Sequence, residues 1–193
     1  MKASLSLFLL SLTFFCSDIA AQNQATIHFD LRPGAKVPVT MTGATRARLA
    51  GNSNNSNTAS AATLEQQIFA MINAERAKNG LVDLEWSESV ATVARMHSAD
   101  MAHEKFFGHR GSDGSMVDDR ADRAGLGTWR TIGENIAYMR GFEDPAALAV
   151  EKWLESPAHR KNLLGPNWKE SAVGVSVTAD GTYYMTEVFL LRK

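Results

Sequence analysis

Cysteine is almost absent from this sequence, and Cys16 is the only one in 193 residues. It lies near a basic start at residues 1–2 and an apolar run at residues 5–15, and small residues follow. This pattern predicts a signal peptide over residues 1–21, cleaved after Ala21. The mature chain would then contain neither a disulfide nor a cysteine nucleophile. Core packing must therefore stabilise it in an oxidising compartment.

A long apolar run at the N-terminus is also missing. Residues 5–15 are too short to cross a bilayer, which needs about 20 apolar residues. A lipoprotein signal at Cys16 is an alternative, but Phe14 and Phe15 stand where such a signal would have small residues. The chain is therefore expected to be secreted, either outside the cell or into a periplasm, and not to be an integral membrane protein.

A surplus of charge of one sign is missing as well. The sequence has 20 Lys and Arg against 21 Asp and Glu, a formal net charge of −1. A basic surplus is the usual sign of a nucleic-acid partner, so none is expected here.

Residues 22–61 differ in composition from the rest. Pro33 and Pro38 interrupt any regular element, and residues 51–62 (GNSNNSNTASAA) are polar and of low complexity. Such a segment buries too little surface to offset the entropy of ordering it, so 22–61 is predicted to be a flexible tether. Residues 62–193 are numerous enough to form one domain with its own core.

Apolar residues at helical spacing predict a series of helices in this domain. The predicted starts are Thr63, Ser87, Met116, Asp144 and Ser156. Thr63 and Gln66 form a capping box, and Asp144 precedes a proline in the first helical position. The sequence Asn79-Gly80 is the expected stop of the first helix.

The C-terminal part changes from helical to alternating periodicity. Residues 173–177 alternate valine with smaller residues, a turn follows at 179–181, and residues 183–191 are rich in β-formers. Residues 131–138 add a third candidate strand. Helices first and strands last predict an α+β fold, with helices packed on an antiparallel sheet.

Five segments together resemble the CAP domain, shared by cysteine-rich secretory proteins, antigen 5 and pathogenesis-related 1 proteins. They are MINAERAKNGLVDLEW (71–86), FFGH (106–109), GENIA (133–137), WLESPAHRKNLL (153–164) and AVGVSV with YYMTEVF (172–189). The likeness is to small, disulfide-free bacterial members and covers about residues 64–191. It implies an α-β-α sandwich, in which a central antiparallel sheet lies between helical layers.

The resemblance also implies a cleft in which two histidines face two glutamates, in some members around zinc or another divalent ion. His109 of FFGH, Glu134 of GENIA and His159 of SPAHR match three of these positions. Two imidazoles and a carboxylate suit a borderline-soft divalent cation. His109 and His159, with Glu134, are therefore the expected metal ligands.

The second acid departs from the family pattern. Ser156 stands at its position, with Glu155 one residue earlier, so Glu155 is taken as the fourth residue of the cleft. Glu187 on the last strand is an alternative, and Glu151 is a poorer one. Because of this departure, any zinc is expected to bind weakly.

The other histidines have simpler interpretations. His97 shares an apolar stripe with Val90 and Met101, which predicts a hydrogen-bonded core histidine. His103 is expected in solvent, and His28 lies in the tether.

Three functions are compatible with these residues. The favoured one is a non-enzymatic binding module whose cleft takes a small hydrophobic or lipid-like ligand, or whose surface binds an extracellular partner. A metal-dependent, protease-like hydrolase using the same cleft is the second, although the sequence has neither an H-E-x-x-H nor a G-x-S-x-G motif. The third is a structural extracellular domain.

Overall fold

A computed structural model describes residues 56–193 of the chain. The elements are α1 (Ser56–Lys78), β1 (Glu85–Trp86), α2 (Glu88–Glu104), α3 (Val117–Arg123), β2 (Trp129–Arg140), α4 (Pro145–Glu155), α5 (Pro157–Leu163), β3 (Glu170–Val177) and β4 (Thr182–Arg192). The predicted signal peptide and most of the predicted tether lie outside the described residues.

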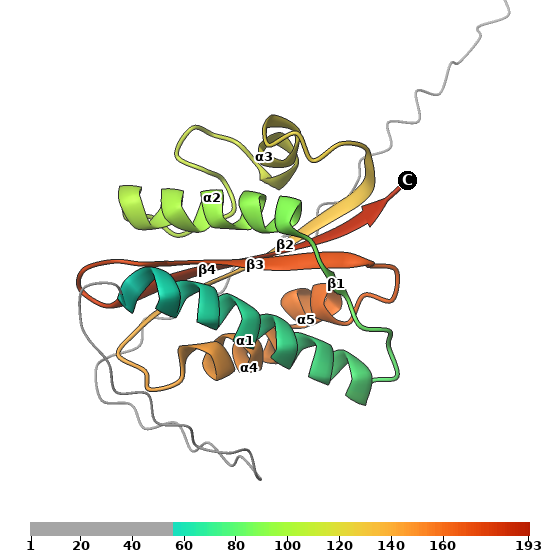
Figure 1. Ribbon diagram of the computed structural model, residues 1–193, viewed down its shortest axis with the longest axis horizontal. Coiled ribbons are helices and arrows are strands. Elements are labelled where there is room, and N and C mark those ends of the chain that lie inside the picture. Colours follow the sequence, from blue (N-terminus) through green and yellow to red (C-terminus); the bar gives the residue numbers. More distant parts are fainter. Residues whose placement is uncertain (1–55) are drawn as a thin grey trace, which may run out of the picture.

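The elements form three layers (Figure 1). Helices α2 and α3 cover one face of the sheet, and α1, α4 and α5 cover the other. The strand order is β1-β3-β4-β2, so β2 lies at an edge. The predicted α+β fold and α-β-α sandwich are confirmed.

The sheet is mixed rather than purely antiparallel. β4 pairs antiparallel with both β2 and β3, as predicted, but β1 pairs parallel with β3. β1 is only two residues long. A strand that short leaves no alternating pattern in the sequence, which is why it was not predicted.

The first helix begins earlier than predicted. It starts at Ser56, and Thr63 lies inside it rather than at its N-cap. The residues before Thr63 include Ala59, Ala61 and Ala62, and alanine has the lowest free-energy cost in a helix. The predicted end is confirmed, since α1 stops at Lys78 and Gly80 follows with a φ of 70°.

The predicted apolar stripe of the fourth helix forms part of the core. Asp144 caps α4 by accepting a hydrogen bond from the backbone N–H of Ala147 at 2.9 Å. Ala146, Ala149 and Trp153 are then buried, as predicted from the helical spacing. The indole of Trp153 also donates to the backbone oxygen of Ile136 in β2 at 2.9 Å, which ties α4 to the edge strand.

The side chains of β2 point alternately to the two faces of the sheet. Val188 and Leu190 of β4 pack in the cluster under α2 and α3, whereas Met185 and Phe189 pack with α1, α4 and α5. Glu134 is the register partner of Val188. Glu134 therefore points to the α2–α3 layer, and neighbouring side chains of β2 alternate between the layers.

A glycine sets the distance between α2 and the sheet. A Cβ added at Gly174 of β3 would lie 2.3 Å from the backbone nitrogen of Arg95 and 2.4 Å from the carbonyl carbon of Ala94. Backbone atoms of a packed helix cannot move aside as a flexible side chain can, so the contact requires glycine.

We expect Gly174→Ala to lower the free energy of unfolding by at least about 1–3 kcal/mol, the usual cost of overpacking. Urea denaturation of the purified protein measures it. Gly108→Ala is the control, because its added Cβ would meet no atom within 4 Å. The close packing of α2 would be contradicted if Gly174→Ala stayed within about 0.5 kcal/mol of wild type.

Candidate functional site

Glu134 of β2 is the centre of a buried polar cluster. Its side chain has no exposed surface. His109 Nδ1 lies 2.7 Å from Oε1, and Arg120 Nη2 lies 2.5 Å from Oε2. His97 Nε2 lies 3.9 Å from Oε1. Both carboxylate oxygens are thus engaged.

Three segments of the α2–α3 layer bring these partners to the sheet. His97 comes from α2, and the following loop carries His109. Arg120 comes from α3 and also donates to the backbone oxygens of His109 at 3.2 Å and Ser115 at 3.0 Å. One guanidinium therefore holds both the loop and the carboxylate.

The charges in the cluster favour an ionised Glu134. Burial by itself would raise the pKa of this carboxyl. The hydrogen bond from His109 and the electrostatic interactions with His97 and Arg120 outweigh burial and bring the pKa below its ordinary value. A buried ion pair with Arg120 is the result at neutral pH.

The hydrogen bonds fix the protons of two imidazoles. A carboxylate and a carbonyl only accept, so His109 Nδ1 donates to Glu134, and His97 Nε2 donates to the backbone oxygen of Gly108 at 2.9 Å. The other ring nitrogens, His109 Nε2 and His97 Nδ1, are buried and have no hydrogen-bond partner within residues 56–193. Burial lowers the pKa of His97, which favours its neutral form.

His159 reaches the cluster from the opposite layer. It lies on α5 and is fully buried, and its backbone oxygen accepts from Asn135 Nδ2 at 3.2 Å. Burial, and then the charge of His109, lower the pKa of His159 to about 4. The two histidines thus interact electrostatically across the edge strand β2. Asn162 fastens α5 there by donating to the backbone oxygen of Glu134 at 3.1 Å.

The predicted second acid, Glu155, does not join this cluster. Its side chain is 58% exposed and pairs with Lys152 at 2.6 Å. It follows the buried Trp153 by two positions, which is about 200° around a helix and therefore on the solvent side. Taking Glu155 as a cleft residue was wrong, because α4 continues regularly to its end. Glu151 also lies beside Lys152, at 3.5 Å.

Glu187 is buried but belongs to the other face of the sheet. Its Oε1 accepts from Ser171 at 3.2 Å, and Oε2 has no hydrogen-bond partner in the described part of the chain. Burial raises the pKa of Glu187 well above the ordinary value, although Ser171 and the charge of Arg76 oppose this. It does not supply the missing acid.

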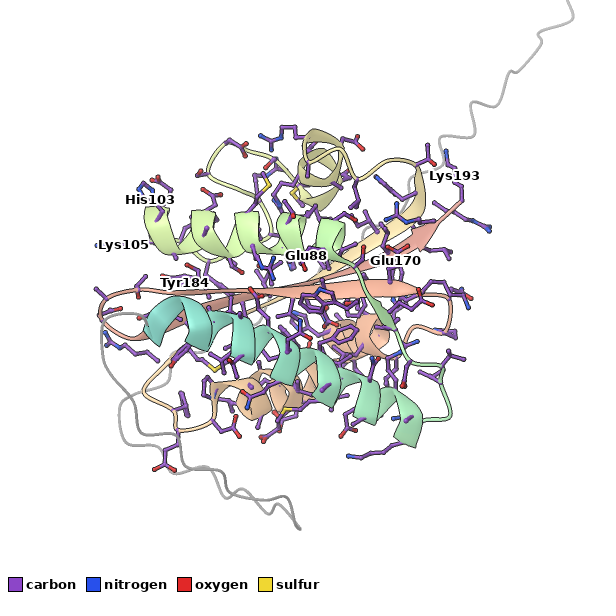
Figure 2. All side chains as sticks on the ribbon, viewed as in Figure 1. Glu88, His103, Lys105, Glu170, Tyr184 and Lys193 are labelled. Atoms are coloured by element: carbon purple, nitrogen blue, oxygen red, sulfur yellow. The ribbon has the colours of Figure 1, made fainter. Side chains whose placement is uncertain are left out.

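The predictions for His97 and His103 are confirmed, and His28 lies outside the described residues. His97 is a fully buried, hydrogen-bonded histidine of the core. His103 projects into solvent at the end of α2 with its side chain 84% exposed (Figure 2). The sequence did not indicate that His97 would border Glu134, nor that Arg120 would be its ion-pair partner. The one available signal was that Arg120 shares a buried stripe with Val117 and Ala121.

The cluster lies beneath the surface rather than along an open cleft. His109 is 6% exposed, and Glu134 and His159 are 0% exposed. A hollow of about 760 Å³ lies beside the cluster, and Asn162 is the residue through which the two are connected. The expected histidine- and acid-lined cleft is therefore closed at these side chains.

A divalent metal is a poor fit to these residues. No group of three or more His, Cys, Asp or Glu within residues 56–193 is arranged to hold an ion. Both oxygens of Glu134 are engaged, and the fixed positive charge of Arg120 beside them would repel a cation. The expected zinc ligation by His109, His159 and Glu134 thus has no support from the side-chain arrangement.

Removing either charge of the buried pair should be costly. We expect Glu134→Gln and Arg120→Met each to lower the free energy of unfolding by about 3–5 kcal/mol, because each leaves the other charge buried without its partner. The double variant should lose much less than the sum. A double-mutant cycle from urea denaturation measures this coupling, and strictly additive losses would contradict the ion pair.

Acid should destabilise the fold through the buried histidines. The pKa of His159 is about 4 in the folded protein and 6.5 ordinarily, so the unfolded chain binds the proton more strongly. The contribution of neutral His159 to the free energy of unfolding is fully present above pH 6.5 and is lost as pH falls from 6.5 to about 4. It is on the order of 3 kcal/mol for His159.

Urea denaturation between pH 7.5 and pH 4.5 tests this dependence. His159→Gln should flatten the change of unfolding free energy with pH, whereas the same change at the exposed His103 should leave it as in wild type. An unchanged slope in His159→Gln would show that this histidine is not the titrating group.

Comparison with known proteins agrees with this architecture. Residues 69–190 match the family model of CAP, the cysteine-rich secretory protein family. The chain is 40% identical over 130 residues to the uncharacterized membrane protein YlbC of Bacillus subtilis (strain 168), covering 67% of this chain and 35% of YlbC. It is 34% identical over 123 residues to the uncharacterized protein YkwD of the same strain, covering 64% and 46%. The match therefore spans less than half of either relative.

Two solved structures extend the comparison. An extracellular protein containing an SCP domain from Bacillus anthracis str. Ames has a TM-score of 0.61 and 32% identity, covering 75% of this chain and 45% of that one. An outer surface protein from Borrelia burgdorferi has a TM-score of 0.60 and 21% identity, covering 66% and 92%, which shows a shared fold. None of the helices in residues 56–193 is long and apolar enough to cross a membrane. By sequence and by fold, the chain belongs to the CAP family.

Proposed function

We propose that this protein is a secreted binding module and that its buried His/Glu/Arg cluster holds the domain together rather than performing catalysis. The observation that carries the proposal is that Glu134 is fully buried with both oxygens engaged, by His109 and Arg120. A general base must lie within hydrogen-bond reach of its substrate, and this carboxylate is fully buried with each oxygen already accepting a hydrogen bond. Secretion is supported by the signal pattern at residues 1–21 and by the extracellular and outer-surface descriptions of similar structures.

A hydrolase fits these residues less well. Metal-dependent hydrolysis needs a metal with an open position for water and a route for the substrate. Burial of His109 and His159 closes that route, and Arg120 opposes the cation. A purely structural role, the third candidate, predicts that no ligand binds to the surface of the domain.

A group of aromatic side chains next to the cluster suits a small hydrophobic or lipid-like ligand. Phe107 and Tyr138 are half-buried, with ring centroids 5.8 Å apart, and Tyr138 lies 5.1 Å from Tyr184. Half-buried aromatic surface with a phenolic hydroxyl nearby is typical of sites for amphipathic ligands and protein partners.

A thermal-shift screen of the purified protein tests the proposal. The screen contains fatty acids, other lipid-like compounds and zinc. A separate absorbance assay with chromogenic ester and peptide substrates measures any hydrolysis. A ligand at a hundredfold excess over its dissociation constant should stabilise the protein by about 2.7 kcal/mol. Phe107→Ala should remove that gain. Phe69→Ala is the control, because Phe69 is also a half-buried ring but packs on Trp86 in the other layer.

We expect no zinc stabilisation near neutral pH and no hydrolysis. Turnover of an ester or peptide that His109→Gln abolishes would overturn the proposal in favour of the hydrolase. Zinc stabilisation lost in Glu134→Gln would contradict only the statement that these residues fit a divalent metal poorly. The absence of any stabilising lipid-like ligand or extracellular partner would favour the structural role.

A further inference from the structure

A surface hollow lies next to Asn162, the residue that donates to the backbone oxygen of Glu134. The loop that joins α5 to β3 curves past the end of the sheet where β2 begins and β4 ends (Figure 1). There it borders this hollow of about 760 Å³. The hollow includes none of the histidines or glutamates of the buried cluster.

The hollow has an unbalanced charge. Its lining contains three cations, Arg130, Lys161 and Lys169, and no carboxylate. All three side chains are exposed, and none forms an ion pair or a side-chain hydrogen bond within the part of the chain that the structure describes. By contrast, Arg192 nearby is paired with Glu170 at 2.6 Å. In a chain with a net charge of −1, this is a local excess of positive charge.

One wall of the hollow is a fixed indole. Trp168 Nε1 donates to the backbone oxygen of Asn162 at 3.0 Å, and the ring stacks on Phe189 with centroids 5.7 Å apart. A Cβ added at Gly165 or Gly133 would lie 2.5 Å or 3.1 Å from the indole, so both glycines leave the room that it occupies. The aromatic surface is therefore held in place before any ligand arrives.

The loop itself is also anchored from below. The buried guanidinium of Arg76 donates to the backbone oxygens of Leu163 at 2.7 Å and Gly165 at 3.0 Å. A loop fixed by a buried arginine loses little conformational entropy on binding. Such preorganisation raises affinity without additional contacts.

We infer that this hollow binds an anionic group, phosphate or carboxylate, carried on a sugar-sized ring. The three cations would pair with the anionic oxygens, Arg130 by its two-pronged guanidinium, and the indole of Trp168 would contact the ring. The side-chain amides of Asn162 and Asn167 line the same hollow and offer hydrogen bonds to ring substituents. This inference rests on the proposed binding role and names a ligand class for a separate surface.

Titration of the purified protein at low ionic strength tests the inference. The probes are glucose 6-phosphate, glucuronate, inorganic phosphate and glucose. Binding is monitored by ¹H–¹⁵N NMR of the Trp168 indole and of the backbone of residues 161–169. The two charged sugars should shift these signals, inorganic phosphate should bind more weakly, and glucose should not bind. The charged sugar with the lower dissociation constant identifies whether phosphate or carboxylate is the preferred anionic group.

Lys161→Gln should weaken binding of the charged sugars about tenfold or more, as expected for loss of a charged hydrogen bond. Arg160→Gln is the matched control, since it removes one charge from the adjacent exposed residue, which is not part of the lining. Equal losses in both variants, or inorganic phosphate binding as tightly as the sugars, would reduce the effect to general charge attraction and overturn the inference.

Two further outcomes separate this inference from the proposed function. Tighter binding of single-stranded DNA that depends on Lys161 would replace the ligand class with nucleic acid. Failure of every anion while a lipid-like ligand still binds at Phe107 would reject the inference and leave the proposed binding module standing.

Discussion

The carboxylate of Glu134 is buried on the central sheet and carries a charge that the fold must compensate. A buried charge without a partner costs several kcal/mol, so its neighbours are constrained to remain in place. Arg120 provides the opposite charge, and His109 and His97 surround the same oxygen. The loop after α2 carries His109 and the short helix α3 carries Arg120, so this cluster helps to hold both segments on the sheet.

The backbone of Glu134 extends the same constraint to the opposite layer. Its carbonyl oxygen accepts from Asn162 of α5, which also donates to Asn135 Oδ1 at 2.9 Å. The backbone oxygen of Asn162 in turn receives the indole N–H of Trp168, the wall of the hollow that carries the three cations. One residue of the edge strand thus joins both helical layers and the loop in which the proposed anion site lies.

The sequence predicted the parts of this structure that depend on local periodicity. The cap at Asp144, the buried stripe of α4 and the alternating strands follow from neighbouring residues, and they were correct. The misses in the buried cluster depend on distant residues. Arg120 is the clearest case, since it gains its role only when β2 brings Glu134 beneath it. Glu155 was a local miss, because α4 continues regularly to its end and turns this side chain to solvent. Family resemblance supplied His109, Glu134 and His159, yet it gave no indication that their cluster would be closed by an arginine.

The ionisation of Glu134 tests this account most directly. A ¹³C NMR titration of the glutamate carboxyls measures it, with Glu187 as an internal comparison of equal burial on the opposite face. The account predicts that the pKa of Glu134 lies below the ordinary 4.5, because His109 and Arg120 stabilise its charge, and that the pKa of Glu187 lies well above 4.5. A Glu134 that titrates above 4.5 would contradict the ion pair and restore this carboxyl as a candidate acid for catalysis.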